Sequence, residues 1–282
     1  MSISNNSSPN VSLQKSNGLP PELPPTDDYG QLLPQLLSEP RAGRAGWGVS
    51  WITNALSIFK DNFLLWLGIG VVYLIIAMVM SAMPIINFVF SLISFVFVGG
   101  IIKGANAQVT GKELRFDHLF SAFSTHLLPL IVLFVLYMAA LIIAFIPIGI
   151  ILIVVSHVMG GIGNVDSMMT AEQIGAGSIV AILLVLLFSM IAFFFLFVMV
   201  WFAPALIVLH NIAPTEAMKM SVKGCLKNIL PLFVFSLLLP LLALLSILFT
   251  LGLAILVVVP IGMITYYTSY RDVWTDQPLS DI

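Results

Sequence analysis

Long apolar runs without a single charged residue constrain the fold of this chain more than any other feature. The chain has 282 residues, of which 60% are hydrophobic and only 9% are charged, with a mean hydropathy of +1.09. Soluble domains contain about 25% charged residues, and an uncharged run of about 20 residues is long enough to cross the hydrocarbon core of a bilayer as a helix. The sequence therefore predicts an all-α membrane protein.

Six apolar runs are predicted to be transmembrane helices, which makes the expected fold a polytopic membrane bundle of six helices. The runs cover about residues 63–83, 85–102, 127–155, 178–209, 229–249 and 253–270. The third run is longer than one crossing requires. Its last part, residues 148–155, covers only about 12 Å as a helix, so it either extends the third helix or re-enters the membrane.

The distribution of Lys and Arg predicts that the N-terminus and the C-terminus are both cytoplasmic. All 11 basic residues lie before the first run, in the connections 103–126 and 210–228, or after the last run. Cytoplasmic connections of membrane proteins are enriched in Lys and Arg, so six crossings place every basic residue inside. An odd number of crossings would place part of them outside.

Two terminal segments differ in composition from the predicted transmembrane domain, which covers residues 46–275. Residues 1–45 are rich in Ser, Asn, Pro and Gly and show no helical or strand period. Such a segment buries too little apolar surface to fold alone, so we expect a disordered cytoplasmic tail. Residues 276–282 are expected to form a second, short cytoplasmic tail.

Three segments resemble one another and predict a threefold internal repeat. Residues 51–65, 116–129 and 217–231 each contain a short amphipathic stretch, then a polar residue, then the start of an apolar run. The three polar residues are Asn62, His126 and Asn228. Each repeat is expected to form an interfacial amphipathic helix followed by a transmembrane hairpin. Amphipathic helices of this kind lie at the level of the headgroups with their apolar side towards the lipid.

A basic stripe in the third amphipathic stretch is the first candidate site. Lys219, Lys223 and Lys227 recur at every fourth position, so they share one face of a helix. Lys at the inner surface of a membrane attracts the phosphates of anionic lipids, which makes these residues candidates for contact with lipid headgroups. The rule that places basic residues in cytoplasmic connections accounts for the same stripe without a lipid site.

A polar line inside the second apolar run is the other candidate. Asn87, Ser91 and Ser94 share one helix face, either as a polar path in the membrane or as groups that hydrogen-bond between helices. The sequence contains no catalytic motif, and its four His and single Cys lack the spacing of a metal site, so we expect no catalytic, cofactor-binding or metal-binding residues. The net charge of −2 argues against nucleic acid as a partner.

Four short motifs carry a resemblance to a known protein family. They are Gly46–Ile52, Phe202–His210, Ala217–Ser221 and Ser269–Asp272. Through these motifs, residues 46–275 resemble an uncharacterised bacterial family of six-helix inner-membrane proteins, which looks distantly akin to the membrane domain of some glycerophosphodiester phosphodiesterases. The resemblance implies a location in the bacterial cytoplasmic membrane, and it brings no functional residues with it.

The predicted function is interaction rather than catalysis. An uncharged membrane interior and three interfacial helices favour a non-enzymatic inner-membrane protein that binds membrane lipids, or another membrane or cytoplasmic protein. The alternative is a carrier or channel for an uncharged or apolar solute. This alternative requires a polar path near Asn87, Ser91 and the helix break expected at Pro147.

Overall fold

The secondary structure is helical throughout the part of the chain that the structure describes. The computed structural model describes residues 26, 30, 32–158 and 176–280, where the only strand-like features are isolated β-bridges. The helices are α1 (Trp47–Asp61), α2 (Phe63–Ser81), α3 (Pro84–Val109), the 3-10 helix η1 (Phe116–Phe120), α4 (Ser121–Thr125), α5 (Leu127–Val158), α6 (Ala176–Val200), α7 (Ala203–His210), α8 (Pro214–Lys227), α9 (Ile229–Phe249) and α10 (Ile255–Trp274). The prediction of an all-α fold is confirmed.

Five helical segments are long and apolar enough to cross a membrane. They are Phe63–Ser81, Pro84–Val109, Leu127–Ile153, Ile182–His210 and Ile229–Phe249. At most 33% of the most apolar stretch of each segment is buried inside the protein. Most of this apolar surface is therefore left exposed by the protein itself, which is compatible with a multi-pass membrane protein whose helices contact lipid. The predicted span 253–270 is not among the five, because the second half of α10 is polar.

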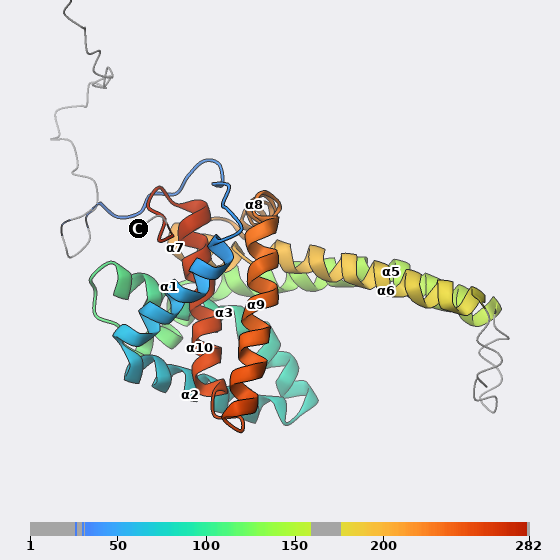
Figure 1. Cartoon of the computed structure of the whole chain (residues 1–282), viewed down its shortest axis with the longest axis horizontal. Helices are drawn as coiled ribbons and strands as arrows, with labels where there is room; N and C mark the ends of the chain where they lie inside the picture. Colours follow the sequence, from blue (N-terminus) through green and yellow to red (C-terminus); the bar gives the residue numbers. More distant parts are fainter. Residues whose placement is uncertain (1–25, 27–29, 31, 159–175, 281–282) are drawn as a thin grey trace, which may run out of the picture.

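The third predicted run forms one long helix. α5 continues through Val158 with Pro147 inside it, so residues 148–155 extend this helix. α5 and α6 lie side by side and extend beyond the other helices, across the direction of α9 and α10 (Figure 1). Transmembrane helices tilt by at most about 40° from the membrane normal. If the α5–α6 pair and the α9–α10 pair both cross one bilayer, the angle between the two pairs must therefore be smaller than in this structure.

The three amphipathic stretches pack against other helices of the chain, and the first one buries its apolar face. α1 packs against α9 and α10, with Trp51, Ala55 and Phe59 almost completely buried. η1 and α4 pack against α3, while α8 packs against α6 and α7. The expectation that the apolar face lies against lipid is therefore wrong for α1. In the other two stretches it stays a prediction for the part that the protein leaves exposed, which includes Phe116 and Phe120 of η1 and Leu226 of α8.

The last part of the predicted N-terminal tail, residues 32–45, is ordered, which corrects the prediction of disorder there. The backbone N–H of Leu37 donates to the C=O of Trp274 (2.9 Å), and that of Arg41 donates to the C=O of Val273 (2.8 Å). Both carbonyls belong to the last turn of α10, where a helix leaves its C=O groups without an intrahelical partner. The segment is therefore ordered by backbone hydrogen bonds that satisfy the end of α10.

Residues 276–280 of the predicted C-terminal tail are ordered as well and fold back on α10. The carboxylate of Asp272 accepts hydrogen bonds from the backbone N–H groups of Leu279 (2.6 Å) and Ser280 (2.9 Å). We call residues 32–41 and 273–277 together the terminal clasp, because hydrogen bonds between them join the two ends of the described chain. The clasp lies against the end of α10 (Figure 1).

Candidate lipid-contact site

The sequence of α8 explains where this helix starts and how its charges are placed. Pro214 occupies the first turn, where its missing N–H costs no hydrogen bond. Glu216 lies in the first turn and Lys227 in the last, and both charges match the sign of the helix dipole at their end. The helix ends at Lys227, and Asn228 alone separates it from α9. α8 is therefore a short helix whose C-terminal, basic end directly adjoins a membrane-length helix.

The basic stripe lies on the exposed face of α8. Lys219, Lys223 and Lys227 are all exposed, whereas Met218 and Cys225 on the other side of the helix are buried. The helical spacing that the sequence predicts for the three lysines is thus present. Their ammonium groups form a row at the surface of the protein, which is the arrangement that contact with anionic headgroups requires.

The three lysines differ in their partners. Nζ of Lys219 lies 3.4 Å from Oε2 of Glu216, and Nζ of Lys223 lies 2.5 Å from Oε1 of Glu39. Lys227 has no such carboxylate partner within the described ranges. The hydrogen bond from Lys223 lowers the pKa of Glu39 below its ordinary value. Both ion pairs are more than half exposed and therefore weak, so a lipid phosphate can compete with either carboxylate.

Asn228 fixes the basic end of α8 to the N-terminal segment. Its side-chain oxygen accepts a hydrogen bond from the backbone N–H of Gly43 (2.7 Å). Its amide nitrogen donates to the C=O of Arg41 (2.8 Å) and to that of Gly224 (2.9 Å). The side chain is fully buried, so these bonds satisfy its polar atoms without water. The position of Lys227 relative to α9 is therefore held by a buried polar contact.

The hydroxyls of the polar line of α3 bond to the backbone of their own helix. The hydroxyl of Ser91 donates to the C=O of Asn87 (2.9 Å), and that of Ser94 donates to the C=O of Ser91 (2.7 Å). Hydroxyls that bond to their own helix backbone offer no donor to a passing solute. Asn87 itself is exposed on the outer surface of α3. The structure thus gives no support to a carrier or channel built on these three residues.

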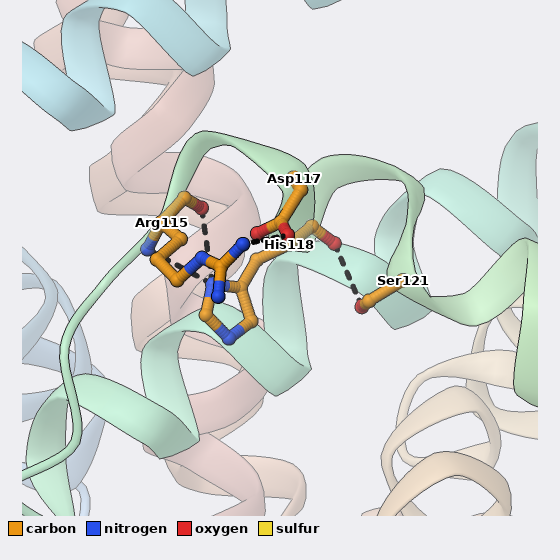
Figure 2. A network of polar contacts seen from close by, with 4 residues as sticks. All are labelled: Arg115, Asp117, His118 and Ser121. Atoms are coloured by element: carbon orange, nitrogen blue, oxygen red, sulfur yellow. Dashed lines mark hydrogen bonds and ion pairs between the residues drawn. The ribbon is translucent and has the colours of Figure 1, made fainter.

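A second polar group lies at η1, where Figure 2 shows Arg115, Asp117, His118 and Ser121. The guanidinium of Arg115 pairs with the carboxylate of Asp117 (2.8 Å), and its backbone N–H donates to Nδ1 of His118 (3.0 Å). The hydroxyl of Ser121 donates to the C=O of His118 (2.8 Å). These contacts are local, within one or two turns of the chain. They cap η1 and account for its polar residues without a ligand.

Two of the histidines and the single cysteine have their own separate surroundings in the described part of the chain. Nε2 of His126 lies 2.9 Å from Oδ1 of Asn211, and His210 hydrogen-bonds to the hydroxyl of Tyr270. Within residues 32–158 and 176–280, no group of three or more His, Cys, Asp or Glu side chains could hold a metal ion. Cys225 is buried, and burial raises the pKa of its thiol far above its ordinary value. This thiol stays protonated and is a poor nucleophile.

Two buried charged residues at the end of α10 are structural features that sequence reasoning missed. Arg271 donates to the hydroxyl of Tyr267 (2.8 Å) and to the C=O of Gln277 (3.0 Å). Asp272 is fully buried and is satisfied by backbone N–H groups of the C-terminal segment. Buried charges require such partners. The only sequence signal was their place in the motif Ser269–Asp272. Arg271 contacts the terminal clasp at Gln277, and Asp272 holds residues 279 and 280 against the end of α10.

Comparison of the chain with protein-family models, with curated proteins and with solved structures found no match. The resemblance of its four motifs to a bacterial membrane family therefore stays a prediction. What supports a function is the geometry of α8 and its surroundings.

Proposed function

We propose that the protein is a non-enzymatic integral protein of the bacterial cytoplasmic membrane that binds anionic lipids at its cytoplasmic face. The observation that carries this proposal is the exposed row of Lys219, Lys223 and Lys227 on a helix that packs against membrane-length apolar helices. A Lys or Arg close to an anionic membrane surface contributes about 1 kcal/mol of attraction. Lys227, which has no carboxylate partner in the described part of the chain, provides the first contact.

The terminal clasp supports six crossings of the membrane. Because its hydrogen bonds join residues near both ends of the described chain, these two ends lie on the same side of the bilayer. The number of crossings between them is then even, whereas five segments meet the criteria of length and composition. α10 supplies the sixth crossing in this proposal, since its 20 residues cover about 30 Å.

Each pair of long helices follows a short helix, as the internal repeat predicts. α1 precedes α2 and α3, η1 with α4 precedes α5 and α6, and α8 precedes α9 and α10. For all six to cross one bilayer, the α5–α6 pair must turn relative to α9 and α10. The chain has helix breaks at both ends of that pair, at His126 and at Trp201 and Phe202. A turn about these breaks leaves α5 and α6 intact but divides the segment Ile182–His210 between α6 and α7.

Binding of defined lipids to the purified full chain tests the proposed function. The chain is studied in detergent micelles, and phosphatidylglycerol and phosphatidylcholine are titrated while native mass spectrometry counts the bound lipids. The variant carries Lys219→Gln, Lys223→Gln and Lys227→Gln. Loss of three attractions of about 1 kcal/mol each lowers the affinity for phosphatidylglycerol by up to about 100-fold and leaves phosphatidylcholine unaffected.

The matched control removes three other basic charges from the same predicted side of the membrane. It carries Lys15→Gln, Lys60→Gln and Lys112→Gln, so its net charge equals that of the α8 variant. The proposal predicts a small loss of phosphatidylglycerol binding in this control. Equal losses in the two triple variants would show that net charge alone attracts the lipid and would contradict a site on α8.

A further inference from the structure

A group of polar side chains lies where α3, α4 and α7 meet. A Cβ atom on Gly99 of α3 would lie 2.9 Å from Cγ1 of Val208 in α7 and 3.3 Å from Cβ of Ala122 in α4, so the three elements are in close contact at this level. The side chains that follow about one turn further along these elements are Lys103, Thr125, His126 and Asn211. Hydrogen bonds connect all four of them.

The hydroxyl of Thr125 is the centre of the group. It donates to the C=O of Ser121 (2.9 Å) and accepts from Nζ of Lys103 (2.8 Å). A hydroxyl has one donor and two acceptor positions, so Nδ1 of His126, which lies 2.8 Å from the same oxygen, is a donor to it. Thr125 therefore brings an ammonium group and an imidazole ring to one oxygen atom.

The amide of Asn211 contacts the other nitrogen of the imidazole ring. Its Oδ1 lies 2.9 Å from Nε2 of His126, so in this arrangement both ring nitrogens donate and the ring is cationic. Lys103 and His126 then place two positive charges close together, and no carboxylate of the described residues forms an ion pair with either of them. Like charges at this separation repel each other, and an anion bound beside them offsets the repulsion.

The group also has donors that its members do not use on one another. The ammonium group of Lys103 carries three N–H bonds, of which one is directed to Thr125. Because Oδ1 of Asn211 faces the imidazole ring, the two N–H bonds of its amide nitrogen are directed elsewhere, and Asn211 is exposed. Two cations and several free N–H donors together match the charge and the acceptor oxygens of a phosphate group.

The group does not depend on the direction of the α5–α6 pair. Lys103 belongs to α3, and Asn211 directly follows α7. Thr125 is the last residue of α4, and the backbone N–H of His126 donates to the C=O of Ala122 (2.8 Å), which makes His126 the cap of the same helix. The breaks at His126 and before α7 therefore allow α5 and α6 to turn while these four residues keep their contacts.

We propose that Lys103, His126 and Asn211 form a binding site for a phosphate group. Lys103 follows the apolar run 85–102, His126 precedes the run 127–155, and Asn211 lies just after the run 178–209. This places the site at the level of the lipid headgroups, where both the phosphate of an anionic phospholipid and a soluble phosphate compound reach it. The inference goes beyond the proposed function, because it uses none of the lysines of α8.

Titrations with inorganic phosphate and with phosphatidylglycerol test the site and identify the source of the phosphate. The purified full chain is studied in micelles of an uncharged detergent. Native mass spectrometry counts bound phosphatidylglycerol, and the NMR signals of the imidazole nitrogens of the four His follow inorganic phosphate. Lys103→Met removes the ammonium group, and its matched control Lys112→Met removes the same charge from the connection that follows α3.

Asn211→Gly removes the amide donors in a variant that is expected to fold. The backbone of Asn211 has a φ of 55°, in the left-handed region that Gly adopts without steric cost. This second variant tests the site even if Lys103→Met does not fold.

Lys103→Met is expected to weaken binding of the phosphate probe by about tenfold or more, and Asn211→Gly by about two- to tenfold, whereas Lys112→Met changes it by less than about twofold. A loss for inorganic phosphate identifies a soluble phosphate compound as the ligand, and a loss for phosphatidylglycerol alone identifies the lipid phosphate. Unchanged affinity for both probes in Lys103→Met and Asn211→Gly would overturn the proposal, as would an equal loss in Lys112→Met. If the triple variant of the α8 lysines still loses phosphatidylglycerol in that case, the proposed function stands without this site.

Discussion

Substitution of Asn228 by Ala tests how the cytoplasmic face is held together. The Asn228 side chain makes three hydrogen bonds, of 2.7 Å with Gly43, 2.8 Å with Arg41 and 2.9 Å with Gly224, and two of these connect α8 to the N-terminal segment. A net 0.5–1.5 kcal/mol for each of these two bonds means that Asn228→Ala weakens the attachment of residues 32–44 by about 1–3 kcal/mol. The long apolar helices are not expected to unfold, because none of these bonds belongs to them.

Amide hydrogen exchange of the purified chain in detergent measures this effect. A loss of about 1–3 kcal/mol corresponds to exchange that is about 5- to 140-fold faster for the amides of Leu37, Arg41 and Gly43. The matched control is Asn62→Ala, which changes the same residue type at the corresponding place of the first repeat, where the side chain makes no capping hydrogen bond to α2. Equal exchange in residues 32–44 of the wild type and Asn228→Ala would refute the reasoning.

Two further substitutions give independent predictions. Glu39→Gln releases Lys223, so it should raise the affinity for phosphatidylglycerol several-fold in the lipid titration. Lys223 lowers the pKa of Glu39, so their ion pair is fully present above the ordinary pKa of a Glu and is lost as the pH falls through the lowered value. At such a low pH, the affinity of the wild type for phosphatidylglycerol should therefore approach that of Glu39→Gln. Gly100→Ala should lower the thermal stability and the folded yield, since its Cβ would lie 2.5 Å from the carbonyl oxygen of His118 on η1. Gly149→Ala, whose Cβ meets nothing within 4 Å, should leave both unchanged or slightly raised, and a similar loss in both variants would contradict this account.

The long helices were predictable because their signal is local. An uncharged apolar run specifies a membrane-length helix through its own composition, and the predicted run 229–249 coincides with α9. The internal repeat likewise placed the short helices α1 and α8 before their long helices, because amphipathic spacing and a following polar residue are visible in the sequence.

The contacts of these elements were not predictable from one sequence. Amphipathic spacing reveals that α1 and α8 each have an apolar face, but it does not reveal whether lipid or protein covers that face. The terminal clasp depends on backbone hydrogen bonds to the last carbonyls of α10, and backbone groups leave no trace in composition. The same limit applies to Lys223 and Lys227, whose different pairing depends on where Glu39 lies in space.

The number and direction of the crossings test the central claim most directly. Alkaline phosphatase, which is active only when it is exported, is fused after Ile282, at Lys112 and at Gly163, which lies outside the described residues. Six crossings joined by the terminal clasp predict an active fusion at Gly163 and inactive fusions at Lys112 and after Ile282. An active fusion after Ile282 would place the end of α10 and the clasp outside the cell, and it would contradict both the topology and a lipid site on the inner membrane surface.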